Sequence, residues 1–382
     1  MSKVKFSDVV VRANTKEDRH NTNLEFYVGG EHIDTDEVVI EKRGLIAGST
    51  IGPMFYFGFK AGQVLFVSRN PHLRKAGMVT FDGICSEKTF VLETKDESVL
   101  LQRYLPFILQ SDHFWSYAEA HKSGSVNFFI NWSTLANYEF ELPSIQKQQE
   151  LADVLWAMTE TRLSYKRLIS VTDEIVISRF HEMFGNITAR ETLENLSIKG
   201  PQNGFYRKDD GSAPNMRIVK MKELFANECI SNEKTFDMVN MTPDEQQRFC
   251  LTKSDLLFGR RSLVVEGAGK CRRVGNITTP LAFESSLLRV TLDTSKVLPL
   301  YVQKWFDTDE GNHSIESIRS VTTIAGIKGS DLRKISIPVP AINEQEEFEA
   351  FVQKTDRSKA EIEASLSRLL SAYHSILSEN FS

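Results

Sequence analysis

The chain has 382 residues, of which 41% are hydrophobic, 25% charged and 10% aromatic, and its formal net charge at pH 7 is −5. This length predicts two or three domains, and the composition excludes a disordered, collagen-like or membrane-spanning chain. The most apolar run, 51–59, is too short to cross a bilayer, and no apolar leader is visible, so we expect a cytoplasmic protein without a membrane partner. Four scattered cysteines without metal-ligand spacing predict reduced thiols and no metal site.

The first globular segment is expected over 1–142, with short strands, glycine-rich turns and a helical pattern over 99–121. Its stretch 60–75 carries four basic residues and no acid, although the whole chain is acidic. Charge is therefore segregated along the sequence, which the total hides. The segment closes with alternating apolar residues over 135–142, typical of a strand.

A long helical pattern follows over 143–186. It begins after Pro143 with glutamine and glutamate in its first turns and ends at Gly185-Asn186, a common helix C-terminus. At 1.5 Å per residue this helix spans about 60 Å. A helix of this length needs a partner for its apolar stripe. Ordinary packing in a core is the alternative.

The second globular segment is expected over 187–339, with a helix over 298–308 and a closing strand over 332–339. Its stretch 253–273 carries six bases against two acids, and Tyr206 adjoins a second basic pair. A second long helix is expected over 340–382. Its natural partner is the first helix, in an antiparallel coiled coil.

The two halves repeat at a spacing of 197 residues. The stretch 87–150 aligns with 284–347 without a gap and gives fifteen identities in sixty-four positions. Ordinary residue usage predicts about four. We therefore expect an α/β fold (mixed α+β) with two similar globular domains, separated by two long helices and related by a pseudo-twofold repeat.

This layout resembles the specificity subunit of type I restriction–modification enzymes. The helix-opening motif reads Leu-Pro-x-Ile-x-x-Gln at 142–148 and Val-Pro-x-Ile-x-x-Gln at 339–345. Further family-like stretches are 27–33 and 255–260, the latter with 64–66 as its counterpart. The first copy departs from the family pattern by having Leu142 for valine or isoleucine and Lys147 for an acid.

The resemblance implies a non-catalytic subunit without a cofactor of its own. Each globular domain is then a target-recognition domain that reads one half of a bipartite, asymmetric sequence in double-stranded DNA. The long helices fix the gap between the half-sites and bind methyltransferase subunits, two per chain, which restriction subunits join in the full complex. Two tethered readers gain affinity when their spacing matches that of the half-sites.

Candidate DNA-binding residues are the basic clusters, because arginine and lysine bind phosphates and guanine edges. They are Lys60, Arg69, Arg74, Lys75, Arg207, Lys208, Arg260, Arg261, Lys270, Arg272 and Arg273. Candidate subunit-docking residues lie on the polar faces of the long helices. They are Gln148, Gln149, Arg162, Lys166, Gln345 and Glu349. For any single residue, a solvated surface role is the alternative.

A metal-dependent DNA nuclease is the alternative function. Asp82, Glu93 and Lys95 have the Asp…Glu-x-Lys spacing of a Mg²⁺ site that activates water. The repeat places Thr279, Val290 and Leu292 at the matching positions, so the shared fold does not require this chemistry.

Overall fold

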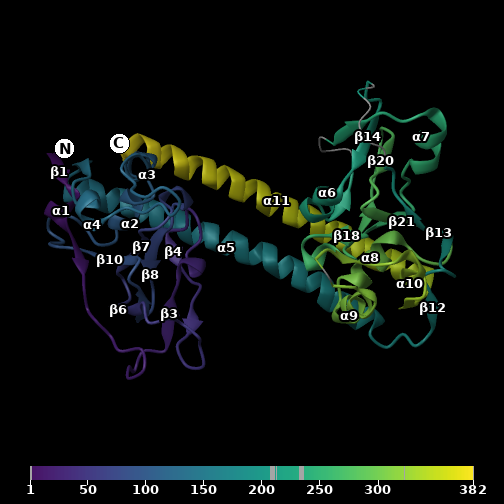
Figure 1. Cartoon of the computed structure of the whole chain (residues 1–382), viewed down its shortest axis with the longest axis horizontal. Helices are drawn as coiled ribbons and strands as arrows, with labels where there is room; N and C mark the ends of the chain where they lie inside the picture. The colour runs from purple at the N-terminus through teal and green to yellow at the C-terminus, as the bar shows by residue number, and fades with distance from the viewer. Residues whose placement is uncertain (1, 207–210, 212, 232–235, 322, 382) are drawn as a thin grey trace. The chain divides into compact units, whose positions relative to one another are not determined.

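The computed structural model describes residues 2–206, 211, 213–231, 236–321 and 323–381. The chain divides into two compact units. Unit 1 comprises Met1–Arg167 and Ile362–Ser382, and unit 2 comprises Leu168–Glu361. Each unit thus contains a mixed α+β body and a segment of both long helices, which Figure 1 labels α5 and α11.

The body of unit 1 contains two sheets and a strand pair. The five-stranded sheet has the order β2 (Val10–Ala13), β10 (Thr89–Thr94), β7 (Val64–Val67), β8 (Ala76–Val79) and β4 (Val39–Ile40). The four-stranded sheet has the order β5 (Gly44–Leu45), β3 (Phe26–Val28), β9 (Gly83–Ser86) and β6 (Phe55–Phe59). The pair is β1 (Ser2–Lys5) with β11 (Glu139–Leu142). The helices are α1 (Phe6–Val9), α2 (Leu105–Ile108), α3 (Asp112–Ala120) and α4 (Trp132–Leu135), with 3-10 turns η1 (Gly30–His32) and η2 (Pro71–Leu73).

The body of unit 2 is built similarly. Its five-stranded sheet has the order β13 (Ser197–Asn203), β21 (Leu287–Leu292), β17 (Asp255–Gly259), β19 (Cys271–Val274) and β15 (Cys229–Ile230). Its other sheets are β16 (Asp237–Val239), β14 (Met216–Val219) with β20 (Leu281–Phe283), β12 (Arg190–Thr192) with β23 (Ser336–Pro338), and β18 (Arg261–Ser262) with β22 (Ala325–Gly326). The helices are α6 (Met221–Ala226), α7 (Pro243–Phe249), α8 (Pro299–Phe306), α9 (Asp309–Ile318) and α10 (Gly329–Leu332), with the 3-10 turn η3 (Val265–Gly267).

The two five-stranded sheets have the same strand directions. β10 is antiparallel to β2 and β7, and β21 is antiparallel to β13 and β17. β8 is antiparallel to β7, and β19 is antiparallel to β17. The edge strands β4 and β15 run parallel to their neighbours β8 and β19. The central strands β7 and β17 are buried along their whole length, as expected for strands covered on both faces.

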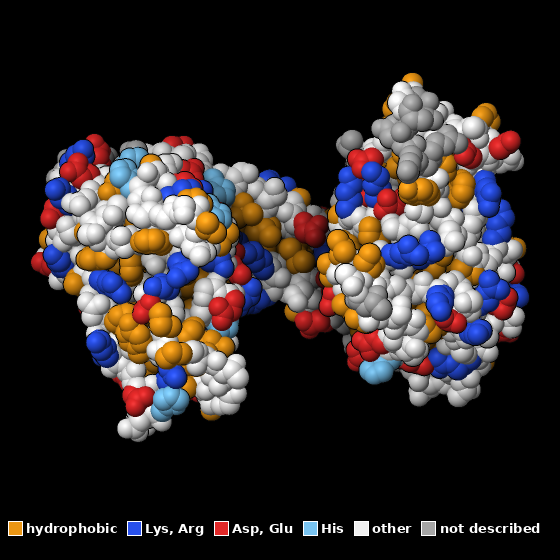
Figure 2. All heavy atoms as spheres, in the orientation of Figure 1, with side chains coloured by type: hydrophobic (Ala, Val, Ile, Leu, Met, Phe, Trp, Pro, Cys, Tyr) orange, Lys and Arg blue, Asp and Glu red, His pale blue; other side chains and the backbone are white. Residues whose placement is uncertain are grey.

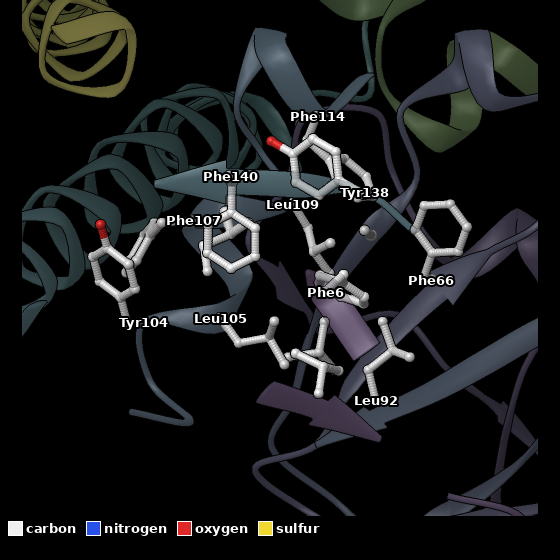
Figure 3. Packing of buried hydrophobic residues seen from close by; sticks show 14 of the residues in the cluster. Phe6, Phe66, Leu92, Tyr104, Leu105, Phe107, Leu109, Phe114, Tyr138 and Phe140 are labelled. Carbon is white, nitrogen blue, oxygen red and sulfur yellow. The ribbon is translucent and has the colours of Figure 1, made fainter. Parts of the chain in front are cut away.

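The main core of unit 1 is rich in aromatic side chains. Phe6 of α1 lies among the rings of Phe114 and Tyr138, at centroid distances of 6.3 and 6.4 Å (Figure 3). Phe66 of β7 stacks on Trp115 at 5.5 Å. The same cluster includes Leu151, Leu155, Tyr373 and Leu377 of the long helices, so the helix segments belong to the core of this unit.

The long helices are α5 (Ile145–Phe184) and α11 (Ile342–Asn380). In unit 2 the ring of Phe180 lies 5.4 Å from that of Phe348, and Lys359 Nζ lies 2.7 Å from Asp173 Oδ1. A later position on α5 thus meets an earlier one on α11, so the two segments run antiparallel there. α5 ends where the amide of Gly185 donates to the carbonyl of His181 over 2.9 Å. In the part of the chain that the structure describes, no helix is long and apolar enough to cross a membrane.

Two local predictions need correction. The closing strands are shorter than expected, because Leu135 and Leu332 lie in the one-turn helices α4 and α10, and the strands begin only at Glu139 and Ser336. The helix expected over 99–121 is two helices. Ser111 separates them because its hydroxyl accepts the amide of Phe114 and caps α3.

Candidate nucleic-acid interface

An arginine follows the central strand of each five-stranded sheet and lies beside a hairpin. In unit 1, Arg69 forms a β-bridge with Phe129, in the hairpin that pairs Ser123 with Phe129. In unit 2, Arg261 pairs in the same way with Gly326, in the hairpin that pairs Ser320 with Gly326, and the carbonyl of the preceding Arg260 accepts the amide of Ile327 over 3.0 Å. The same strand-to-loop transition therefore presents an arginine in both units.

In unit 2 this arginine borders a hollow of about 550 Å³. Arg260, Arg261 and Lys328 line it, and a second hollow of about 720 Å³ shares Lys328 and Ser320 with it. We call the joined hollows the basic groove. Its cations are Arg190, Arg260, Arg261, Arg319, Lys328 and Lys334. Asp331 is the acid among its lining residues, so the groove is strongly positive in the part of the chain described.

The electrostatics of the groove favour an anion. Burial lowers the pKa of Arg260, and the adjacent charge of Arg261 lowers it further. Arginine still remains protonated near neutral pH, because its usual pKa exceeds 12. The half-buried guanidinium of Arg260 beside the exposed one of Arg261 is stabilised by a phosphate or another anion that binds between them.

Apolar side chains are exposed beside these arginines. Leu263 and Val264 follow β18 and are 84% and 54% exposed, and Val321 is 63% exposed. Unit 1 shows the same combination, since Val126 is 84% exposed within the hairpin that bridges to Arg69. Figure 2 shows basic and apolar side chains interspersed on the visible face of both units. Cations with apolar groups match the chemistry of phosphates, guanine edges and thymine methyl groups.

Several predicted DNA-binding residues have structural roles. Arg74, in a left-handed conformation with φ of 49°, lies 2.7 Å from Asp36 and 2.8 Å from Asp112, and Lys75 donates to the carbonyl of Gly30 over 2.6 Å. These contacts hold η2 against the body of unit 1. DNA contact by Arg74 and Lys75 stays a prediction, which these contacts within unit 1 disfavour.

Basic residues of the stretch 253–273 also make contacts within the chain. Arg272 donates to the carbonyl of Asn227 over 2.7 Å and lies 3.6 Å from Asp307. Lys270 and Arg273 are half-buried, and Lys270 lies over the ring of Phe225 at 5.2 Å. DNA contact by Arg272, Lys270 and Arg273 stays a prediction, which these contacts within unit 2 disfavour.

Three predicted residues remain to be placed. Lys60 is exposed at the turn after β6, where its amide donates to Gln63 Oε1 over 2.8 Å. Arg207 and Lys208 lie outside the described residues, next to Tyr206, which is 74% exposed. The strongest candidates in the described chain are Arg69, Arg260 and Arg261.

Sequence reasoning missed four cations of the basic groove. Arg190 lies about 130 residues before Arg319, and only the fold brings the two into one groove. Arg319, Lys328 and Lys334 fall within sixteen residues that include Asp331, a local density that a charge count over 319–334 detects. Arg190 is also held by Glu310 at 2.6 Å, so it is partly neutralised.

The motif glutamines, predicted to dock a partner, are fully buried. Gln148 Oε1 accepts the amide of Leu101 at 3.0 Å, and its Nε2 donates to the carbonyls of Val99 and Pro143, both at 2.9 Å. Its side chain therefore binds the start of α5 to the loop after β10. This role corrects the docking prediction for Gln148.

Gln345 makes the same three bonds at residues 197 positions later. Its Oε1 accepts the amide of Leu298 at 2.8 Å, and its Nε2 donates to the carbonyls of Lys296 at 3.2 Å and Pro340 at 3.0 Å. Gln345 is likewise fully buried, and its docking prediction is corrected for the same reason.

The other predicted docking residues differ in exposure. Arg162 is buried against Glu37 and is also removed from any outer surface. Lys166 is exposed although it contacts Glu37, and Gln149 and Glu349 are half-exposed. An exposed apolar row on α5, absent from the prediction, lies within unit 2. It consists of Leu168, Val171 and Ile175, which are 42–48% exposed.

The nuclease triad does not form a metal site. Asp82 accepts the amide of Ala61 at 2.8 Å, and Glu93 accepts Gln63 Nε2 at 2.7 Å, so each carboxylate supports the turn between β6 and β7. Among the described residues, no group of three or more His, Cys, Asp or Glu side chains is arranged to hold a metal ion. The nuclease alternative is not favoured.

Comparison with known proteins gives relatives of one kind, although no family model matches the chain. The chain is 24% identical over 207 residues to the type I restriction enzyme EcoKI specificity subunit of Escherichia coli K12, covering 53% of this chain and 43% of the relative. It is 25% identical over 153 residues to the EcoDI specificity subunit of Escherichia coli, covering 38% and 33%. The matched segment spans less than half of each relative.

The fold also matches solved structures over the whole chain. A structure described as revealing complex assembly and conformational transition of the type I R-M system aligns with a TM-score of 0.58 and 16% identity, covering 100% of this chain and 97% of the other. The type I restriction–modification S subunit from M. genitalium aligns with a TM-score of 0.57 and 13% identity, covering 100% and 96%. The chain therefore resembles type I specificity subunits in sequence and has their fold.

Proposed function

We propose that this chain is the DNA-specificity subunit of a type I restriction–modification complex and reads a bipartite, asymmetric target. The observation that carries the proposal is the arginine beside a hairpin at the same place in two sheets of identical strand order. The side chains around these arginines differ, with Val126 in unit 1 and Leu263 in unit 2. Two similar scaffolds with different contact residues suit two different half-sites.

Each body acts as a recognition domain, with boundaries proposed at 1–142 and 187–339. Arg69 contacts one half-site, and Arg260 with Arg261 contacts the other, at backbone phosphates and guanine edges of the major groove. The other cations of the basic groove bind backbone phosphates and fix the register. The adjacent exposed apolar side chains contact base edges, including thymine methyl groups.

The long helices, proposed over 143–186 and 340–382, form an antiparallel coiled coil that spaces the two recognition domains. The matching bonds of Gln148 and Gln345, 197 residues apart, support an origin of the chain by tandem duplication. The exposed row Leu168, Val171 and Ile175 supports docking of a methyltransferase subunit on the helices. Gln149, Lys166 and Glu349 remain candidates for the polar part of that surface.

The complex requires other subunits for chemistry. Two methyltransferase subunits per chain supply methyl transfer, restriction subunits join the full assembly, and the complex acts in the cytoplasm. The specificity chain itself contributes recognition without catalysis or a cofactor.

Salt dependence of DNA binding tests this function directly. Methylome sequencing of cells that carry the chain with its methyltransferase identifies the target, and a duplex bearing it is then titrated at 50–300 mM salt. Arg260→Ala with Arg261→Ala should weaken binding and reduce the slope of log K against log salt by about 1–2, since each neutralised phosphate contributes about 0.9. Arg333→Ala is the matched control, because Arg333 pairs with Glu194 at 3.4 Å and does not line the groove. Equal slopes in all three proteins exclude the basic groove as the DNA interface.

A further inference from the structure

In each unit a carboxylate before the edge strand binds a cation on a long helix. Glu37 precedes β4, and its Oε2 lies 2.7 Å from Arg162 Nη2 of α5, with Lys166 on its other oxygen. Glu228 precedes β15, and its Oε1 lies 3.1 Å from Lys359 Nζ of α11. We call Glu37 and Glu228 the anchoring carboxylates.

The two cations occupy matching positions on the helices, and the carboxylates lie two residues before β4 and one residue before β15. Arg162 and Lys359 are 197 residues apart, and β4 and β15 are the parallel edge strands of their sheets. A glutamine also binds the backbone at each carboxylate. Gln110 Nε2 donates to the carbonyl of Glu37 at 3.3 Å, and Gln303 Nε2 donates to that of Glu228 at 3.0 Å. An incidental surface pair would not recur with the same neighbours.

Arg162 is buried and Lys359 is half-buried, which makes these contacts specific. The side chains of Arg162 and Lys359 are 7% and 16% exposed. A charge removed from water to this extent is costly unless it is paired. Arg162 also donates to the carbonyl of Asp36 at 3.3 Å, and Lys359 also binds Asp173 at 2.7 Å. The helix therefore has one favourable position against the sheet edge in each unit.

Apolar side chains hold the early turns of each long helix in the core of its unit, and two polar contacts lie at separated places along the same helix. The first is the motif glutamine, Gln148 or Gln345, at the start of the helix, and the second is the ion pair fourteen residues later. Fourteen helical residues span about 21 Å. The core packing covers the early turns, with Leu155 in unit 1 and Val352 in unit 2, and the ion pair extends the attachment by about two further turns. A tilt of only about 10° over about 21 Å displaces a surface by about 3.7 Å, close to one base-pair step of about 3.4 Å.

We propose that Glu37 and Glu228 are positioning residues that fix each recognition domain on its helix and thereby restrict the gap accepted between the two half-sites. This inference rests on the proposed function, since it requires a bipartite DNA target. Neither carboxylate contacts DNA. Each acts by binding a cation of the long helix, Arg162 or Lys359.

The test compares gap selectivity in single variants. Glu37→Gln and Glu228→Gln keep the side-chain shape and remove the charge, and each is assembled with the methyltransferase. Duplexes carry the identified half-sites with the native gap or with one base pair more or fewer. The native gap should bind within about threefold of the wild type, whereas the preference for it over the altered gaps should fall at least fivefold.

Matched controls remove a carboxylate whose ion pair lies within a body. They are Glu139→Gln, which loses the pair with Lys3 at 2.8 Å, and Glu194→Gln, which loses that with Arg333. Both should retain wild-type selectivity. If the anchoring carboxylates only stabilise the fold, their substitution lowers the folded fraction. Binding to all three duplexes is then weakened by the same factor, and the preference for the native gap is unchanged. Unchanged selectivity in Glu37→Gln and Glu228→Gln overturns the proposal.

A second measurement does not depend on DNA. Nitroxide labels at Leu45 in β5 and Ser164 on α5, both exposed positions in unit 1, report how firmly the body is held to the helix. Glu37→Gln should broaden the distance distribution, whereas Glu139→Gln should not. An unchanged width in Glu37→Gln overturns the anchoring role. A broadened width in a chain that binds no duplex, even with methyltransferase, instead refutes the proposed function.

Discussion

The buried glutamine at the start of each long helix offers a sharp test of how the helices join the bodies. Gln148→Leu replaces the amide by an apolar group of similar size and removes all three of its hydrogen bonds. The amide of Leu101 and the carbonyls of Val99 and Pro143 then lose their partner. The contact with Pro143 is buried and the other two are partly buried.

An unsatisfied buried backbone group costs about 1–3 kcal/mol. Taking this whole range for Pro143 and about 1 kcal/mol for each partly buried group gives a loss of about 3–5 kcal/mol. This is a large fraction of the 5–15 kcal/mol by which a typical domain is stable. Gln345→Leu should cost unit 2 a similar amount, because its three bonds have the same pattern of burial.

Urea unfolding followed by tryptophan fluorescence measures the loss in unit 1, where Trp115, Trp132 and Trp156 lie. With an m-value of about 2 kcal/mol/M, Gln148→Leu should lower the midpoint by about 1.5–2.5 M. Gln149→Leu makes the same chemical change one residue later, where the side chain bonds to Asp153 at the surface, and should shift it by less than about 0.3 M. Equal midpoints for the two variants would refute the role assigned to Gln148.

Two further predictions concern titratable groups. Burial raises the pKa of Cys85 to about 12 and that of Cys271 well above its usual value, so both thiols should resist an aromatic disulfide reagent at pH 8 in the native chain and react only after unfolding; rapid reaction of either would contradict their burial. Burial raises the pKa of Glu228, but Lys304, Lys359 and Arg272 outweigh it and hold the pKa below its usual value. A lowered carboxyl pKa means that the unfolded chain binds more protons, so this stabilisation is present above about pH 4.5 and is lost as the pH falls through the lowered value. The stability difference between wild type and Glu228→Gln, measured by urea unfolding from pH 3 to 8, should therefore be constant near neutrality and vanish in acid, and a difference that grows in acid would contradict this sign.

The candidate site shows what charge density along the sequence selects and what it cannot distinguish. Arg69, Arg260 and Arg261 were selected from local charge density alone, and they lie at the hairpins where a DNA interface is proposed. Arg74 and Arg272 belong to the same clusters by composition, yet they bind Asp36 and Asp307. Residue type and spacing do not reveal which cation an acid far away in the sequence neutralises.

The sequence by itself determined the α+β class, the long helical segments and the spacing of 197 residues, because periodicity, caps and residue identity are local or directly comparable properties. Tertiary structure alone decided which polar residues of the long helices have a structural role. Gln148 and Arg162 have the same helical pattern as solvated neighbours, but the loop after β10 and the carboxylate of Glu37 surround them. A polar side chain acquires a structural role only when distant backbone groups and charges enclose it, since burial without partners is too costly.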